Sequence, residues 1–268
     1  MTKPNNFLII TTTRDPSLPL FFLQTPKNIR IDVFLFEENL DSFQTLKEKL
    51  SIYEYVYIRD PFNSESVRDL SNKTKFVTDN LSSQIISVDQ IRSADDLLIE
   101  DKWLQYQKFS EFLPHTEILS SKSSFNPNTQ FIKKRISSRA KGIVFNLDQI
   151  TNHENYIIQE KIAIQEEYRI YSVYDKIIHP AVFKNSKTQS TAVKIDRTRS
   201  KSITPELKKF VGAIHKKTKL DLIGFDIALT KQNQFKLIEI NRSPQFATFF
   251  EVTKINLANL LLSAMIKN

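Results

Sequence analysis

The 268-residue sequence contains no cysteine and only three glycines, and both shortages exclude classes of protein. Without cysteine there is no disulfide framework, no thiolate metal site and no cysteine nucleophile. A P-loop or a dinucleotide-binding Rossmann turn needs several glycines at fixed offsets, and Gly142, Gly212 and Gly224 do not supply them. If the chain binds a nucleotide, another architecture must hold the phosphates.

Long apolar runs are missing as well. No stretch approaches the roughly 20 apolar residues that a membrane-spanning helix needs, and the N-terminus has no secretory pattern. We therefore expect a cytoplasmic protein that has no membrane partner. The formal net charge of +8 favours an acidic partner. Because the lysines are scattered and form no long basic arm, an acidic small ligand or peptide is favoured over nucleic acid.

Strand and helix signals alternate over the N-terminal third of the chain. Apolar strand-like runs lie at residues 7–11, 31–36, 53–58 and 84–88, and a helical stretch spans 40–50. This alternation predicts a small α/β unit on a mostly parallel sheet. A helix is expected at 95–112, ended by Pro114, because the residue before a proline disfavours the helical conformation.

From residue 129 onward, short strands and turns dominate, interrupted by one amphipathic helix. Thr204 is suited to cap that helix and Pro205 to occupy its first position. The expected elements are hairpins at 130–147 and 168–183, a strand at 156–162, an exposed loop at 184–202, a helix at 205–220, strands at 222–229 and 235–241, and a closing helix at 252–266.

The strongest signal for function comes from the two apolar strands near the C-terminus. The first carries Asp226, and the second carries Glu239 and Asn241. A carboxylate in such a run is costly to bury unless a cation or hydrogen bonds compensate it. Hard oxygen ligands on adjacent strands suit Mg²⁺ held together with nucleotide phosphates. The three residues are therefore candidate metal ligands, and a structural ion pair with basic neighbours is the alternative interpretation.

Several residues upstream are suited to hold the nucleotide. Lysines on strands neutralise phosphate oxygens, and a backbone edge next to a carboxylate suits an adenine. Taken singly, each residue has a common structural explanation as a surface lysine or an ion-pair partner. Their order along the chain carries the interpretation. The candidates are Lys102, Lys133, Gln159, Glu160, Lys161 and Ile162, followed by Arg169.

This order resembles the ATP-grasp superfamily of carboxylate–amine ligases. Within that superfamily, the chain is similar to the ribosomal-protein glutamate ligases and, more closely, to the ATP-grasp maturases of microviridin-type (graspetide) peptides. The resemblance covers residue 101 to the C-terminus and is topological only before that. The motifs that carry it are Gln159-Glu160-Lys161-Ile162, Glu167-Tyr168-Arg169, Asp196-Arg197 and Glu239-Ile240-Asn241.

The resemblance implies an α/β (α+β) ATP-grasp fold with three units: an N-terminal domain at 1–94, a central subdomain at 95–158 and a C-terminal domain with the metal site at 159–268. It implies ATP and two Mg²⁺ ions as cofactors, and it adds Glu167 to the nucleotide-binding residues. Arg169, Arg197 and Lys184 are the cations it implies for the transferred phosphate or the substrate carboxylate. Two departures stand out: the flap at 137–142 has one glycine, and Arg242 stands where the family has proline.

The implied reaction is the activation of a peptide or protein carboxylate as an acyl phosphate, followed by amide or ester formation, with macrocyclisation of a ribosomal peptide as its specific form. The net charge suits an acidic peptide or protein substrate, and the superfamily allows for a homodimer. Two alternatives stay open at this point. One is an ATP-grasp kinase of a polyanionic small molecule, and the other is a degenerate module that binds nucleotide or peptide.

Overall fold

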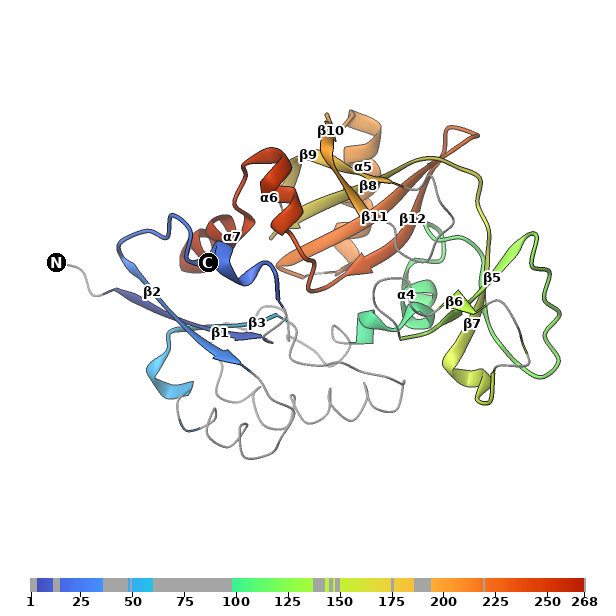
Figure 1. Ribbon diagram of the computed structural model, residues 1–268, viewed down its shortest axis with the longest axis horizontal. Helices are drawn as coiled ribbons and strands as arrows, with labels where there is room; N and C mark the ends of the chain where they lie inside the picture. The colour runs from blue at the N-terminus through green and yellow to red at the C-terminus, as the bar shows by residue number, and fades with distance from the viewer. Residues whose placement is uncertain are drawn as a thin grey trace.

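The computed structural model describes residues 4–11, 15–35, 48, 50–59, 98–136, 143–144, 147, 150–174, 176–185, 194–218 and 220–267. Within these ranges the strands form three sheets (Figure 1). The strands are β1 (Asn5–Thr11), β2 (Ile29–Leu35), β3 (Tyr55–Ile58), β4 (Thr116–Ile118), β5 (Gln130–Lys134), β6 (Ile143–Val144), β7 (Tyr156–Glu160), β8 (Ile164–Val173), β9 (Lys176–Asn185), β10 (Lys194–Lys201), β11 (Leu222–Thr230) and β12 (Phe235–Asn241). The helices are α4 (Lys102–Phe109), α5 (Pro205–Thr218), α6 (Ala247–Thr253) and α7 (Leu257–Lys267), with short 3-10 turns η1 (Leu18–Phe21), η2 (Leu50–Ile52), η4 (Leu98–Glu100) and η6 (His153–Asn155).

The N-terminal sheet is parallel, in the order β2-β1-β3, which confirms the prediction from the alternating strand and helix signals. Its central strand buries four consecutive apolar residues, Phe7 to Ile10. Such a continuous run is typical of a parallel strand that is covered on both faces. The strand expected at 84–88 and most of the helix expected at 40–50 lie outside the described residues.

The central sheet is antiparallel, in the order β4-β7-β5-β6, and it contains the hairpin predicted between β5 and β6. Its small core consists of Leu119, Ile132, Ile150 and Ile158. Strand β7 continues to Glu160, so this sheet extends two residues past the expected boundary at residue 158. The next sheet begins with β8 at Ile164.

The C-terminal sheet is antiparallel, in the order β10-β9-β8-β11-β12, and its two faces differ because successive side chains on a strand alternate. Ile170 and Phe225 share a buried apolar core with Val211 and Ile214 of α5. The capping prediction for α5 is confirmed, since Thr204 Oγ1 accepts from Leu207 N at 3.3 Å. The opposite face carries the charged residues described below.

Two sequence predictions for this region are wrong. Part of the loop expected at 184–202 is the edge strand β10, whose charged, polar sequence is typical of strands that protect a sheet edge. The single closing helix is broken into α6 and α7, because Lys254 adopts a left-handed conformation (φ 61°) that ends α6. Asn256 then begins α7, its Oδ1 accepting from Ala258 N at 3.0 Å.

The helix expected at 95–112 is also shorter than predicted. It begins at Lys102, because the Asp101 side chain accepts a hydrogen bond from Trp103 N at 2.9 Å and caps the helix there. The preceding turn is η4, and the described helix ends at Phe109. Capping therefore places Lys102 in the first turn of α4.

Helices α6 and α7 pack against the N-terminal sheet, far away in sequence (Figure 1). Phe249 and Leu261 share one apolar core with Phe7, Ile9 and Tyr57. The C-terminal end of the chain therefore completes the core of the N-terminal unit. Among the described residues, no single helix is long and apolar enough to cross a membrane, and α6 and α7 pass that test only as a pair bent by 105°.

A buried ion pair ties the N-terminal sheet to the segment after β12. Arg59, which follows β3, pairs with Asp15 (Nε to Oδ2, 2.5 Å) and donates to Pro244 O at 3.1 Å. Its guanidinium also lies 4.9 Å from the centre of the Phe246 ring. In addition, Ser17 Oγ accepts from Phe246 N at 2.9 Å. The segment that leaves β12 is therefore held by side chains from the N-terminal unit.

Replacing Arg59 by methionine leaves Asp15 as an uncompensated buried charge, so we expect Arg59→Met to lower the free energy of unfolding by about 3–5 kcal/mol. Urea denaturation of the full chain measures this. The matched control is Arg30→Met, because Arg30 is 68% exposed and lies 3.6 Å from Asp32. Such a surface pair contributes about 0–1 kcal/mol. Equal unfolding free energies for the two variants would show that the Asp15 pair does not stabilise the fold.

Candidate active site

The register of the C-terminal sheet brings the three candidate metal ligands to one face. Asp226 on β11 lies directly opposite Glu239 on β12 and directly opposite Arg169 on β8. Asn241 lies opposite Gly224, two residues from Asp226 and therefore on the same face. Directly opposed carboxylates repel each other across a strand pair, so this face requires cations.

Asp226 is only 2% exposed and is bound by two cations. Arg169 contacts both carboxylate oxygens, with Nη2 to Oδ2 at 2.8 Å, and Lys184 Nζ lies 2.9 Å from Oδ2. Burial by itself would raise the pKa of the Asp226 carboxyl, but Arg169 and Lys184 outweigh it and lower that pKa to about 2. Asp226 is therefore ionised at neutral pH, and its charge is already compensated.

Lys184 also contacts a second carboxylate on this face. Its Nζ lies 2.6 Å from Glu167 Oε1, so it bridges Glu167 and Asp226. Burial raises the pKa of Glu167, against the opposing effect of Lys184. For Lys184, burial favours the neutral form, but the two carboxylates outweigh it and raise the pKa of the ammonium. Glu167, predicted to bind nucleotide, is thus a buried partner of Lys184.

Because Gly224 has no side chain, the Arg169 side chain has room to lie beside Asp226. A Cβ atom on residue 224 would lie 2.7 Å from Pro244 Cβ and 3.3 Å from Arg169 Cδ. The first separation is too short for any side chain. The glycine therefore allows both Arg169 and the segment after β12 to approach the backbone of β11 closely.

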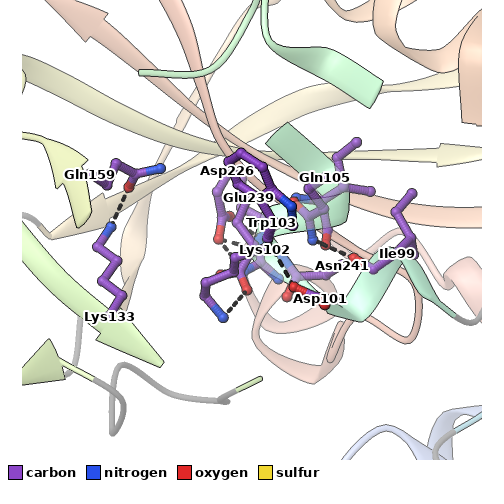
Figure 2. A network of polar contacts seen from close by, with 12 residues as sticks. Ile99, Asp101, Lys102, Trp103, Gln105, Lys133, Gln159, Asp226, Glu239 and Asn241 are labelled. Atoms are coloured by element: carbon purple, nitrogen blue, oxygen red, sulfur yellow. Dashed lines mark hydrogen bonds and ion pairs between the residues drawn. The ribbon is translucent and has the colours of Figure 1, made fainter. Parts of the chain in front are cut away.

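Glu239 and Asn241 are the more accessible of the candidate ligands. Lys102 Nζ lies 3.4 Å from Glu239 Oε1, and the Glu239 side chain is 30% exposed. Asn241 Nδ2 contacts Asp226 Oδ2 at 3.5 Å, and Figure 2 draws these two side chains together with the Lys102–Glu239 pair. Within the described ranges, no group of three or more acidic, histidine or cysteine residues is suited to a metal ion, so the amide of Asn241 is needed as the third ligand. This set of hard oxygens fits Mg²⁺ by its donor chemistry.

The central sheet contributes Lys133, half-buried on β5. Its Nζ donates to Gln159 Oε1 at 2.6 Å (Figure 2). Gln159 Nε2 in turn donates to Thr116 Oγ1 at 3.1 Å. Burial, followed by repulsion from Lys102, lowers the pKa of Lys133 to about 8. Glu239 opposes that shift, which means that Lys133 lies within electrostatic range of the charged face of the other sheet.

The segment from Gln159 to Ile162 divides its side chains between two faces. Lys161 Nζ lies 4.6 Å from the centre of the Phe131 ring, and Lys133 Nζ lies 5.3 Å from the same ring. Glu160 points to the other face, where it accepts from His115 N at 3.4 Å. Ile162 is half-buried in the connection between β7 and β8. The carboxylate of Glu160 is thus separated from the Lys133–Gln159 pair.

The remaining predicted cation, Arg197, lies on β10, in the irregular stretch between Ile195 and Ser200. Its side chain lies outside the described residues, so its predicted role stays a prediction. The ligand and nucleotide-binding roles of the other candidates also stay predictions. The structure joins five of them in one cluster around Asp226: Glu167, Arg169, Lys184, Asp226 and Asn241. Lys102 and Glu239 form a separate pair, and Glu239 lies within electrostatic range of Arg169.

Sequence reasoning missed three residues that support this site. Arg135 pairs with Asp101 at 2.5 Å, which makes Asp101 a buried structural residue at the start of α4. Arg242, noted only as a replacement for proline, is buried and lies 2.7 Å from Glu100. Gln105 is a buried amide on α4. The position of Arg242 directly after Asn241 was the one available signal in the sequence.

The two acidic candidate ligands should respond differently to neutralisation. Asp226→Asn leaves Arg169 and Lys184 without their shared partner, so we expect a loss of about 3–5 kcal/mol in the free energy of unfolding. Glu239→Gln breaks a partly exposed pair and should cost less than about 1 kcal/mol. Urea denaturation of both variants at pH 7 measures this, and similar losses would contradict the assignment of Asp226 as the buried anchor.

The ion pairs of Asp226 with Arg169 and Lys184 also make the free energy of unfolding depend on pH. Because the pKa of Asp226 is lower in the folded chain than in the unfolded chain, its contribution is present above pH about 4 and is lost as the pH falls toward 2. The difference in stability between the wild type and Asp226→Asn should therefore shrink over that range. A difference that does not change with pH would contradict the lowered pKa.

Solved structures with the same architecture cover nearly the whole chain. The ATP-grasp ligase PsnB, complexed with a phosphomimetic variant of its minimal precursor, Mg and ADP, matches with a TM-score of 0.63 at 14% identity, over 99% of each chain. A RiPP-associated ATP-grasp ligase from Chryseobacterium gregarium, in complex with ADP and a leader and core peptide, matches at 0.65 and 15%, over 98% of this chain and 97% of that one. The D-alanine–D-alanine ligase from Bacillus anthracis, complexed with ATP, matches at 0.65 and 13%, over 98% and 96%. The parallel N-terminal sheet and the two antiparallel sheets are thus an ATP-grasp fold, as predicted.

Sequence comparison assigns the family. No curated protein matches the chain. A family model described as the RimK-like ATP-grasp domain matches residues 128–265, a span that includes β5, the whole C-terminal sheet and all three candidate metal ligands. The matched span is more than half of the sequence. The chain therefore belongs to the RimK-like ATP-grasp family.

Proposed function

We propose that this protein is an ATP- and Mg²⁺-dependent ligase that activates a carboxylate of a peptide or protein for amide or ester formation. The observation that carries this proposal is the convergence of charges from two sheets. Lys133 of the central sheet is affected electrostatically by Lys102, Glu239, Glu167 and Lys184. A ligand between these elements would meet cations from both sides and oxygen donors on one side.

The reaction proceeds in two steps. A carboxylate oxygen of the substrate attacks the γ-phosphorus of ATP, the bond to the β–γ bridging oxygen breaks, and ADP leaves. An amine nitrogen or hydroxyl oxygen then attacks the acyl carbon, inorganic phosphate leaves, and the nucleophile gives up one proton. Because the first step brings two anions together, it depends on positioned cations and needs no covalent nucleophile from the protein.

Different residues of this chain bind the phosphates, bind the metal ion and keep Asp226 ionised in this proposal. We assign the binding of phosphate oxygens to Lys102 and Lys133, and Arg169 and Lys184 hold Asp226 in its ionised form. Asp226, Glu239 and Asn241 would hold Mg²⁺, which would supply charge stabilisation for phosphoryl transfer. The positive charge of Lys133 depends on pH in the physiological range, because its pKa is lowered to about 8.

The substrate class follows from charge and from the structural neighbours. The formal net charge of +8 favours an acidic partner. Two of the matched ATP-grasp ligases are described in complex with a precursor or with a leader and core peptide. An acidic precursor peptide, macrocyclised through its side-chain carboxylates, is the specific substrate that we propose for this chain.

Product analysis tests the proposal. With Mg-ATP and a panel of acidic peptides, we expect ADP, free phosphate and a peptide that has lost one water for each bond formed. Glu239→Gln should lower turnover by about a hundredfold or more, the size seen when an electrostatic group at the reacting centre is removed. Glu117→Gln is the matched control, because Glu117 is 63% exposed and pairs with His115. Phosphate retained on the product would indicate a kinase, and nucleotide binding without ADP would indicate a binding module.

The charge of Lys133 makes a second test possible. Below pH about 8 this lysine is protonated, so ATP affinity should be steady there and should fall by up to about tenfold per pH unit above it. Lys133→Arg keeps the charge at every accessible pH and should remove this dependence. Calorimetric titration with ATP between pH 7 and 9.5 measures both proteins. A wild-type affinity that is constant over this range would exclude phosphate binding by Lys133.

A further inference from the structure

Gln105 makes an unusual pair of hydrogen bonds with one residue of β12. Its Nε2 donates to Ile240 O at 3.0 Å, and its Oε1 accepts from Ile240 N at 3.0 Å. The same Nε2 also donates to Ile99 O at 2.5 Å. The side chain is 2% exposed, so these bonds are shielded from water. One side-chain amide thus satisfies both backbone groups of Ile240.

The position of Ile240 gives these bonds their significance. β12 is the last strand in the C-terminal sheet as far as the structure describes it, with β11 on one side only. Ile240 lies between Glu239 and Asn241, two of the candidate metal ligands. Gln105 therefore takes the place of a neighbouring strand at Ile240, the one residue between those ligands.

Other contacts along the same edge come from the same segment of chain. Lys102, one turn before Gln105 on α4, pairs with Glu239. Glu100 pairs with Arg242, directly after Asn241. These contacts fix the charged side chains, whereas the Gln105 contacts fix the backbone. β12 also pairs with β11, and Leu237 N donates to Phe112 O at 2.8 Å, so the Gln105 contacts add to these backbone bonds at the residue between the two ligands.

We propose that Gln105 is a positioning residue that holds the β12 backbone so that Glu239 and Asn241 bind a divalent ion together. This inference rests on the proposed function, and it adds a residue of α4 on which ion affinity depends. The Gln105 side chain bonds to the backbone of Ile99 and Ile240, and we assign it no direct contact with the ion or the nucleotide. It affects ion affinity through its hydrogen bonds to the backbone N–H and C=O of Ile240.

The experiment measures ion binding directly. Mn²⁺ takes the same oxygen ligands as Mg²⁺, and the signal of free Mn²⁺ in electron paramagnetic resonance gives its dissociation constant in the presence of saturating ADP. Gln105→Met has a similar size and lacks both hydrogen bonds to Ile240. We expect its Mn²⁺ dissociation constant to rise by about tenfold or more, as for the loss of an outer partner of a metal ligand. Gln105→Asn, which withdraws the amide by one methylene, should show the same direction if the methionine variant does not fold.

Asn256 provides a matched control at a distance from the site. It is also a buried amide with three backbone contacts, donating to Leu20 O and Leu23 O and accepting from Ala258 N. Asn256→Leu should lower stability and leave the Mn²⁺ dissociation constant within about twofold of the wild type, since additive effects hold for distant sites. Equal weakening by both variants would mean that Gln105 acts only through overall stability, which overturns the proposal.

Two further outcomes separate this inference from the proposed function. If the wild type binds Mn²⁺ with ADP and the folded Gln105 variants bind it equally well, Gln105 does not position the ligands, and the proposed function stands. If neither the wild type nor Glu239→Gln binds Mn²⁺ with ADP, the metal site itself is wrong and both proposals fall. Weakening by the Gln105 variants alone supports the inference.

Discussion

The structure of the site depends on the compensation of one buried carboxylate. Asp226 lies inside a strand with its neighbours on both sides in the sheet, and an ionised group there is stable only with paired cations. Arg169 comes from the adjacent strand in direct register, and Lys184 comes from the strand beyond it. Gly224 leaves the space that Arg169 occupies. The arrangement of this face therefore follows from where the strands place these two cations.

The cations of the site fall into two groups, according to whether they compensate the buried charge of Asp226. Arg169 and Lys184 are largely buried and engaged with carboxylates, so an incoming phosphate must share them or displace an existing pair. Lys133 is paired with a neutral amide, and Lys102 contacts a partly exposed carboxylate across 3.4 Å. A phosphate group loses less by binding to these two lysines. This difference supports our proposal that Lys102 and Lys133 bind the nucleotide phosphates, whereas Arg169 and Lys184 keep Asp226 ionised.

The features that could be predicted from the sequence are those that follow from the local alternation of side chains. Asp226, Glu239 and Asn241 share a face because alternation in two adjacent antiparallel strands requires it, and the spacing alone indicated this. The sequence of β10 predicts a loop, because a charged edge strand lacks an apolar face. Gln105 was missed for a related reason, since a glutamine on a helix is ordinarily exposed and nothing in the sequence reveals its partner 135 residues away. Pairings such as Arg59 with Asp15 depend in the same way on the tertiary fold.

The end of β12 is contacted by two other parts of the chain. Ile99 of η4 and Phe109 of α4 lie in the core of the C-terminal sheet, and side chains of this same segment contact Ile240 and Arg242. From the N-terminal unit, Arg59 donates to Pro244 O and Ser17 accepts from Phe246 N. A shift of β12 or of the segment after it would break these buried hydrogen bonds. Each buried polar group left without a partner costs free energy. The backbone that carries Glu239 and Asn241 is therefore held by contacts from segments far apart in the sequence, and these contacts form only in the folded chain.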